Sequence, residues 1–200
     1  MLPQFLYRGD SDPNNKRQLK STFNSGLLLT NLISGGNGTE VFNSSIVQLV
    51  NRHIATGWDK THFLSFTTNE NVAFHYGNND KTFDEVYDET PTWDFAVLTF
   101  DTTILLQDSI KEISTGIFVA QFFPICKEFL PSYKMILIDA LTHLKSIANK
   151  STIDLTTAIE KAEQDSEWLV LPASPFGHNG EFTAKFDTAC ITAKRIFRYE

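Results

Sequence analysis

The chain has 200 residues, of which 42% are hydrophobic, which suits one globular domain with a sizeable core over residues 1–200. Its formal net charge is -7, with 24 acidic against 17 basic residues. Nucleic-acid-binding surfaces usually carry a basic excess, so this charge argues against a nucleic-acid partner. No apolar run reaches membrane-spanning length, which argues against a membrane partner, and the segment Met1–Leu6 lacks the regions of a secretion signal.

The first expected element is a strand over residues 3–9, which leads through Tyr7 and Arg8 into a turn-rich segment that begins at Gly9. Arg8 therefore stands at the end of a strand. Its guanidinium has a planar set of donors that suits the oxygens of a pyrophosphate or a ribose. The alternative is a surface ion pair with a neighbouring aspartate such as Asp10.

The next segments carry structure without visible chemistry. A short helix is expected over residues 16–25, and we interpret the loop Ser34–Gly38 as a linker because it matches neither the dinucleotide-binding nor the P-loop pattern. An amphipathic helix is expected over residues 39–56, since apolar side chains recur there at steps of three and four: Val41, Phe42, Ile46, Leu49, Val50 and Ile54.

The segment Phe63–Phe66 is interpreted as a short, largely buried strand that carries one hydroxyl, that of Ser65. Thr67 is followed three residues later by Glu70, which is the pattern of a capping box, so a helix is expected over residues 70–76. Both hydroxyl residues also have a purely structural interpretation. Ser65 is then satisfied by backbone groups, and Thr67 is only a helix cap.

Residues 78–94 are rich in aspartate and glutamate and are expected to form a solvated loop, with a lid beside a binding cleft as the alternative. The rest of the chain mixes apolar strands with amphipathic helices, which predicts an α+β fold. Helices are expected over residues 133–148 and 152–161. Strands are expected over residues 95–100, 117–123, 168–171, 181–186 and 190–199. The second of these strands also fits a helix.

Familiar motifs of other enzyme classes are absent from the sequence. The five histidines form no HExxH motif, and there is no GxSxG motif, so we expect neither a metalloprotease nor a serine hydrolase. Cys126 and Cys190 form no CxxC pair and cannot frame a metal site, so no bound metal is expected. The two cysteines are either free thiols or a single disulfide.

Three short segments, taken together, give the chain a resemblance to a known family. Tyr7-Arg8, Ser65-Phe66-Thr67 and Asp165-Ser166-Glu167 stand in the order of an aromatic-Arg pair, a Ser-x-Ser/Thr strand and an acidic-x-Glu turn. This arrangement resembles the mono-ADP-ribosyltransferases of the cholera-toxin-like class over most of the chain. The resemblance implies a split core of two small, mostly antiparallel β-sheets with helices packed outside, and it implies NAD as the co-substrate.

The resemblance also gives each matched residue a role. Glu167 would hold the ribose 2′-hydroxyl of NAD and face the positive charge that develops on the sugar, and Ser65 would steady Glu167. Arg8 would bind the phosphate side, and Asp165 would be the general base that activates the acceptor. The residues implied to contact NAD are Tyr7, Arg8, Gly9, Asp10, Ser65, Thr67 and Glu167.

The sequence departs from the family at Asp165. Members that modify arginine usually have Glu at this place, and several that modify asparagine or nucleobases have Gln. Because Asp165 matches neither, the identity of the acceptor is the least constrained part of the prediction. An alternative frame, Glu163-Gln164-Asp165, places the acidic pair one turn earlier. The acidic run is also compatible with the solvated end of a helix.

The resemblance implies transfer of ADP-ribose from NAD to a side chain of a target protein, with arginine favoured and nicotinamide released. Two alternatives stay open: an NAD glycohydrolase, in which water is the acceptor, and a binding module that keeps the fold without catalysis. Because the family is found mostly among bacterial toxins and effectors, we expect a protein that is secreted or translocated into a host cell. The bacterial cytoplasm is the alternative location.

Overall fold

The chain folds into two compact units whose segments alternate along the sequence. The computed structural model describes residues 1–10, 39–56, 63–78, 91, 94–105, 110–121, 133–172 and 191–198. Predictions that lie outside the described residues are the helix over 16–25, the loop 34–38, the strand over 181–186, both cysteines and most of the acidic segment 78–94.

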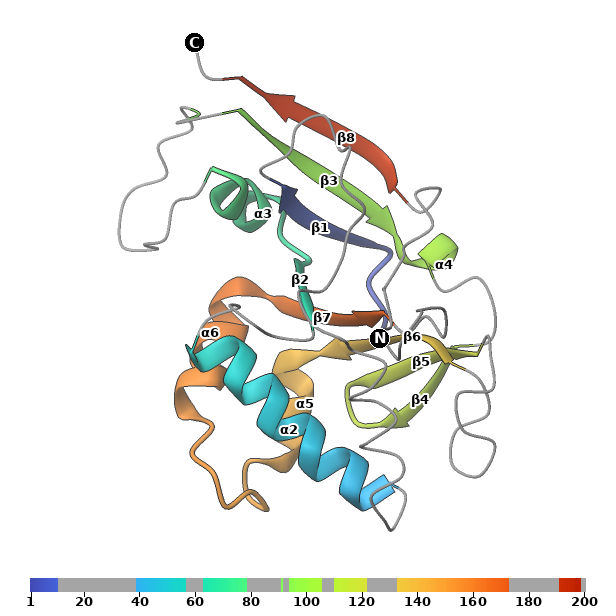
Figure 1. Cartoon of the computed structure of the whole chain (residues 1–200), viewed down its shortest axis with the longest axis vertical. Coiled ribbons are helices and arrows are strands. Elements are labelled where there is room, and N and C mark those ends of the chain that lie inside the picture. The colour runs from blue at the N-terminus through green and yellow to red at the C-terminus, as the bar shows by residue number, and fades with distance from the viewer. Residues whose placement is uncertain are drawn as a thin grey trace, which may run out of the picture. The chain divides into compact units, whose positions relative to one another are not determined.

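Unit 1 contains β1 (Phe5–Asp10), the end of β2 (Leu64–Thr67), α3 (Glu70–Gly77), β3 (Phe95–Asp101), the short helix α4 (Thr102–Leu105) and β8 (Ile191–Phe197). Its strands are antiparallel neighbours in the order β2-β1-β3-β8, with α3 beside β1 (Figure 1). β1 runs along β3 in an unbroken register, from Phe5 opposite Asp101 to Asp10 opposite Ala96.

Helix α3 packs against β1 and β3 over a small apolar cluster. Ala73 of α3 forms its buried centre together with Phe95 and Val97 of β3. The backbone of β1 comes so close to α3 that a Cβ atom on Gly9 would overlap the carbonyl oxygen of Ala73 and the backbone nitrogen of Gly77. Only glycine lacks this atom, so Gly9 has a packing role that is independent of any ligand.

The start of α3 differs from the prediction. Asn69 is the N-cap, because its side-chain oxygen accepts the N–H of Asn71 at 3.0 Å. Thr67 accepts the N–H of Asn69 at 2.9 Å and stays in β2, opposite Tyr7 of β1. The predicted capping box of Thr67 and Glu70 is therefore wrong, since an asparagine caps a helix as well as a threonine and here follows the strand. The helix itself is confirmed.

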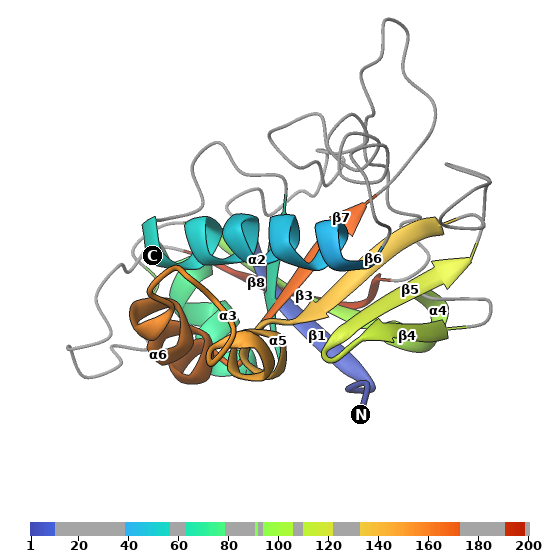
Figure 2. The ribbon, with the colours of Figure 1, turned by 90° about the horizontal axis from the view of Figure 1, so that it is seen from below.

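Unit 2 contains α2 (Thr39–Thr56), the start of β2, β4 (Ile110–Ser114), β5 (Ile117–Gln121), β6 (Tyr133–Asp139), α5 (Ala140–Ile147), α6 (Thr156–Asp165) and β7 (Glu167–Pro172). Its strands stand in the order β4-β5-β6-β7-β2, and the pairings from β4 to β7 are antiparallel. Helices α2, α5 and α6 lie together against one side of these strands (Figure 2). The shared core includes Ile46, Val50, Ile117, Ile136, Ile138, Leu144, Ala158 and Leu169.

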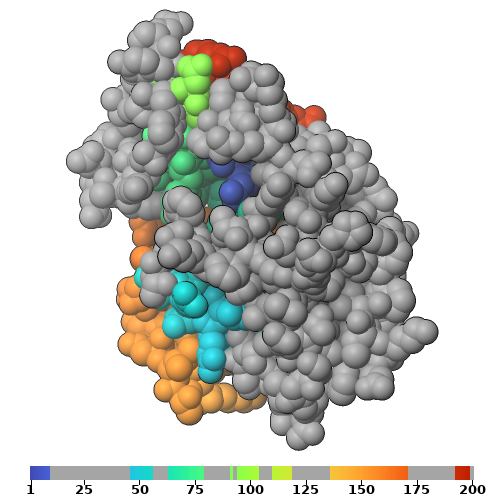
Figure 3. Space-filling view, viewed as in Figure 1, coloured from blue at the N-terminus to red at the C-terminus, as the bar shows by residue number. Residues whose placement is uncertain are grey.

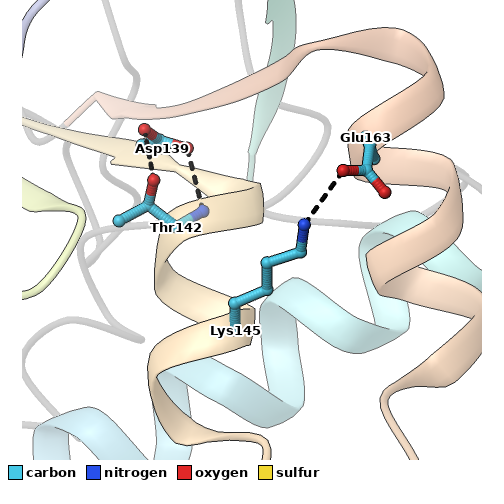
Figure 4. Close-up of polar contacts among 4 residues, drawn as sticks. All are labelled: Asp139, Thr142, Lys145 and Glu163. Atoms are coloured by element: carbon cyan, nitrogen blue, oxygen red, sulfur yellow. Dashed lines mark hydrogen bonds and ion pairs between the residues drawn. The ribbon is translucent and has the colours of Figure 1, made fainter.

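The predicted helix over residues 133–148 is wrong in its first half, which forms β6. Residues Ile136–Ile138 are fully buried one after another, which fits a strand covered on both faces and not one stripe of a helix. Asp139 then begins α5, because its carboxylate accepts the N–H of Thr142 at 3.0 Å and the hydroxyl of Thr142 at 2.8 Å (Figure 4). Apolar residues continue at helical spacing across this cap, so their spacing did not reveal the boundary.

The predicted α+β class is confirmed, with antiparallel pairing in the described ladders. The helix predicted over residues 39–56 is α2, and the strand predicted over residues 117–123 is β5. None of the described helices is long and apolar enough to cross a membrane.

Candidate functional site

A buried histidine in unit 2 marks the candidate site. His53, in the last turn of α2, belongs to a buried stripe that also contains Ile46 and Val50. It is only 3% exposed, and its ring packs edge-on against that of Phe63, with 5.6 Å between the ring centres. A histidine in such surroundings requires a polar partner, because an unsatisfied buried ring nitrogen destabilises the fold.

Ser65 of β2 and Glu167 of β7 provide the polar partners. The Nε2 atom of His53 lies 2.7 Å from Ser65 Oγ and 3.7 Å from Glu167 Oε1. The Ser65 hydroxyl also hydrogen-bonds to the Glu167 side chain. An ionised carboxylate only accepts, so Ser65 donates to Glu167, and the Ser65 oxygen then accepts the Nε2–H of His53. His53 and Ser65 thus form a chain of two hydrogen-bond donors that ends at the carboxylate of Glu167.

Burial controls the charge of Glu167, which is 8% exposed. Its pKa is raised from 4.5 to about 7, chiefly because burial takes the carboxylate out of water. The hydrogen bond from Ser65 opposes this rise, the negative charge of Asp165 adds to it, and the positive charge of Lys161 opposes it. Near neutral pH both protonation states of Glu167 are populated, which is typical of carboxyl groups that take part in catalysis.

An abrupt turn between helix and strand holds the two acidic residues. Asp165 is the last residue of α6, and Glu167 is the first residue of β7. Ser166 between them has a left-handed backbone, with φ of 49° and ψ of 47°, and its N–H bonds to the carbonyl of Glu163 at 3.3 Å. Asp165 and Glu167 are each 8% exposed, so neither lies at a solvated helix end.

Lys161 connects the two helices beside the site. It precedes Asp165 by one helical turn, and its Nζ donates to the carbonyl oxygen of Ala55, near the end of α2, at 3.3 Å. α2 and α6 pack side by side, and parts of both lie at the surface (cyan and orange in Figure 3). An ion pair, Lys145 with Glu163 at 2.9 Å, joins α5 to α6 (Figure 4). These contacts hold α6 against the rest of unit 2, and they therefore also hold the turn at Ser166 that follows it.

The other predicted site residues belong to unit 1. Arg8 is half-buried in β1, and its guanidinium carbon lies 5.8 Å from the centre of the Phe66 ring, within the range of a cation–π contact. Tyr7 packs against the apolar cluster beneath α3, and Gly9 allows the close approach of that helix. Asp10 is the last residue of β1. Tyr7 and Gly9 therefore have packing roles in unit 1 whether or not they contact NAD.

The structure brings together three of the predicted residues, Ser65, Asp165 and Glu167, and adds His53 and Lys161, which the sequence analysis did not select. His53 stands on the apolar stripe of its helix, and a polar residue on such a stripe signals a buried polar contact. Lys161 lies four residues before Asp165, a spacing that places both on one side of a helix. The contact of Ser65 with Glu167 is the one that the resemblance implies.

Comparison of the chain with protein-family models, with curated proteins and with solved structures gives no match. Within the described ranges, no group of three or more histidine, cysteine, aspartate or glutamate residues is placed to hold a metal ion. The chemistry of the site is argued from its own side chains. These are a buried carboxyl group of raised pKa, a hydroxyl donor fixed against it, and a second acidic residue next to it.

Proposed function

We propose that the chain is a mono-ADP-ribosyltransferase, which breaks the bond between nicotinamide and ribose in NAD and transfers ADP-ribose to a side chain of a target protein, with arginine favoured. The observation that supports this most is the hydrogen bond from Ser65 to the buried carboxylate of Glu167. It joins two residues that are far apart in the sequence and that the resemblance assigns to one site. The order of the three motifs along the chain is further support.

The reaction expels a neutral nicotinamide. The bond from ribose C1′ to the ring nitrogen breaks, its electron pair goes to that nitrogen, and positive charge builds on the sugar. An ionised Glu167 that faces the sugar stabilises this charge, because a carboxylate already fixed in a buried site has little reorganisation left to undergo. The acceptor then bonds to C1′ and gives its proton to Asp165.

The donors around Glu167 influence how much of it is ionised. Ser65 donates to the charged form, and His53 holds the Ser65 oxygen in that orientation, so both residues favour the carboxylate. Burial favours the neutral acid. The balance between burial and the two donors gives Glu167 a pKa of about 7. The positive charge of bound NAD at its nicotinamide ring would shift that balance further toward the carboxylate.

An NAD glycohydrolase, with water in place of the protein acceptor, is a second candidate. The burial of Asp165 favours it, since this residue is only 8% exposed at the end of α6. Water reaches a buried carboxylate more readily than an arginine side chain of another protein does. Both candidates release nicotinamide, whereas a binding module without catalysis releases none.

Substitution of Glu167 tests the proposal. Glu167→Gln keeps the volume and removes the charge, so nicotinamide release from NAD should fall by about 100-fold or more. Glu163→Gln is the matched control, because Glu163 is an exposed carboxylate on the preceding helix α6 that forms an ion pair with Lys145, and it should leave the rate within about twofold of wild type. Full release by Glu167→Gln, or no release by the wild type, would contradict the proposal.

Biotin-labelled NAD in a cell lysate separates the two candidates. Labelling of discrete proteins that disappears in Glu167→Gln supports transfer to protein and identifies the targets. Nicotinamide release without labelling supports the glycohydrolase.

A further inference from the structure

His143 is a buried titratable group that the proposed chemistry does not use. It lies in the first turn of α5 and is 0% exposed. Its Nδ1 atom is 3.4 Å from the carbonyl oxygen of Thr115. A carbonyl only accepts, so in the neutral ring Nδ1 carries the proton and Nε2 carries a lone pair. Nε2 is buried and has no hydrogen-bond partner.

The carbonyl that His143 contacts belongs to the turn between β4 and β5. This turn consists of Thr115 and Gly116, and Gly116 has φ of 75°, a conformation that favours glycine. A Cβ atom on Gly116 would lie 2.8 Å from the backbone nitrogen of His143 and 3.0 Å from the carbonyl oxygen of Asp139. The Gly116 carbonyl also accepts the N–H of Asp139 at 2.8 Å. The turn is therefore docked closely on the start of α5.

No charged group in the described part of the chain forms an ion pair with His143, so nothing there balances a proton on Nε2. The carboxylates described on β4 and at the start of α5 are engaged elsewhere, since Glu112 accepts the N–H of Gly116 at 2.9 Å and Asp139 caps α5. The other charged or titratable side chains described on α5, on β4 and on the elements packed against α5 are Arg52, His53, Lys111, Lys145, Glu160, Lys161, Glu163, Asp165 and Glu167.

We propose that His143 is an acid-sensitive latch: the neutral ring keeps the turn Thr115–Gly116 of the β4–β5 hairpin docked on α5, and protonation of Nε2 releases this turn. The turn then opens in acid while the pairing of β5 with β6 and the rest of unit 2 stay intact. The latch requires no NAD chemistry, so its failure and the failure of the proposed function are separate outcomes.

The direction of the pH dependence follows from burial. Protonation is unfavourable while the turn is docked, because the charge is buried and the new N–H has no acceptor. Burial therefore holds the pKa of His143 below its ordinary value of 6.5, and the contact with Thr115 opposes this only in part. Docking is intact above pH 6.5 and weakens as the pH falls below it. Uptake of one proton raises the opening constant by up to about tenfold per pH unit.

Hydrogen exchange at the backbone amides of Gly116, in the turn, and of Asp139, which donates to the Gly116 carbonyl, tests the latch, after correction for the intrinsic pH dependence of exchange. In the wild type, the opening constant of these amides should rise by up to about tenfold between about pH 6 and about pH 5, with a smaller rise in α2 and β7. His143→Asn keeps a donor near the place of Nδ1 but cannot take up a proton, so the rise should be absent. His75→Gln, at a buried histidine of unit 1, is the control and should keep the wild-type response.

Three results would overturn the latch: no acid-linked rise at the amides of Gly116 and Asp139, the same rise in His143→Asn, or an equal rise in α2 and β7, which is unfolding of the whole unit. Titration of the His143 ring by NMR in the wild type is a second measurement that needs no variant. A midpoint below 6.5 is expected, and a midpoint at or above 6.5 also overturns the proposal.

Discussion

The carboxyl group of Glu167 is buried, and burial opposes its negative charge. Because the pKa of Glu167 is about 7 in the fold, ionisation at a higher pH destabilises the folded protein. His53 lies 3.7 Å away, and Lys161 lowers the pKa of Glu167, yet together with Ser65 they do not offset the effect of burial. Groups held in such an unfavourable state are concentrated at functional sites, which is why this residue is central to the proposal.

The raised pKa of Glu167 predicts a pH-dependent effect of Glu167→Gln on stability. The pKa is 4.5 in an unperturbed glutamate and about 7 in the fold, so folding favours the protonated form. This contribution to stability is complete below about pH 4.5 and is lost as the pH rises through about 7. Above that range Glu167→Gln should be more stable than the wild type, by up to about 3 kcal/mol, and below about pH 4.5 the two should be equal.

Urea unfolding at about pH 8 and at about pH 4 measures this difference. Glu163→Gln serves as the control again, because its carboxylate is exposed and its effect should depend little on pH. The same stability difference at both pH values for Glu167→Gln would show that burial does not raise the pKa.

At the scale of elements, the site depends on how α2, β2 and β7 bring one side chain each to a common point. His53→Leu removes the donor to Ser65, whose hydroxyl is then no longer directed at Glu167, and the pKa of Glu167 should rise above about 7. His53→Gln places an amide N–H near the position of Nε2 and should restore the wild-type value. NMR titration of the Glu167 side-chain carbon measures both. No rise in His53→Leu, or an equal rise in both variants, argues against the donor chain.

Elements whose apolar residues recur with one clear period were predictable from the sequence, and elements without such a period were not. The helix over residues 39–56 has apolar residues at steps of three and four along its length, and it forms as expected. β6 was predicted as helix because its buried residues also fit helical steps when they are counted together with those of α5. β4 was not predicted, since an edge strand that exposes Ile110, Lys111 and Glu112 shows no alternation of apolar and polar residues.

The candidate site could be predicted only in part. Ser65 and Glu167 were selected because they stand in two of the motifs that carry the family resemblance, a Ser-x-Ser/Thr strand and an acidic-x-Glu turn. The place of His53 depends on the packing of α2 against the strands of unit 2, which residue spacing along the chain does not record. The left-handed turn at Ser166, between the buried Asp165 and Glu167, was not predictable either, because serine carries no sequence signal for that conformation.

At the scale of the whole molecule, the segments of two compact units alternate along one chain. Unit 2 contains every member of the hydrogen-bonded chain that ends at Glu167, together with the buried His143. Unit 1 contains Arg8 with its aromatic neighbour Phe66. The proposed cleavage of NAD requires the ionised form of Glu167. The pH dependence of the reaction rate reports how much of this form is present.

The most direct test is the pH dependence of nicotinamide release at low NAD, where the rate reports kcat/KM and so the free protein. We expect the wild-type rate to rise with pH, to reach half its maximum near pH 7, where Glu167 ionises, and to level off by about pH 8.5. Glu167→Gln should give a low rate without this rise. A wild-type rate that does not change between about pH 5.5 and about pH 8.5, or the same rise in Glu167→Gln, would contradict the assignment of Glu167 as the group that stabilises the developing charge.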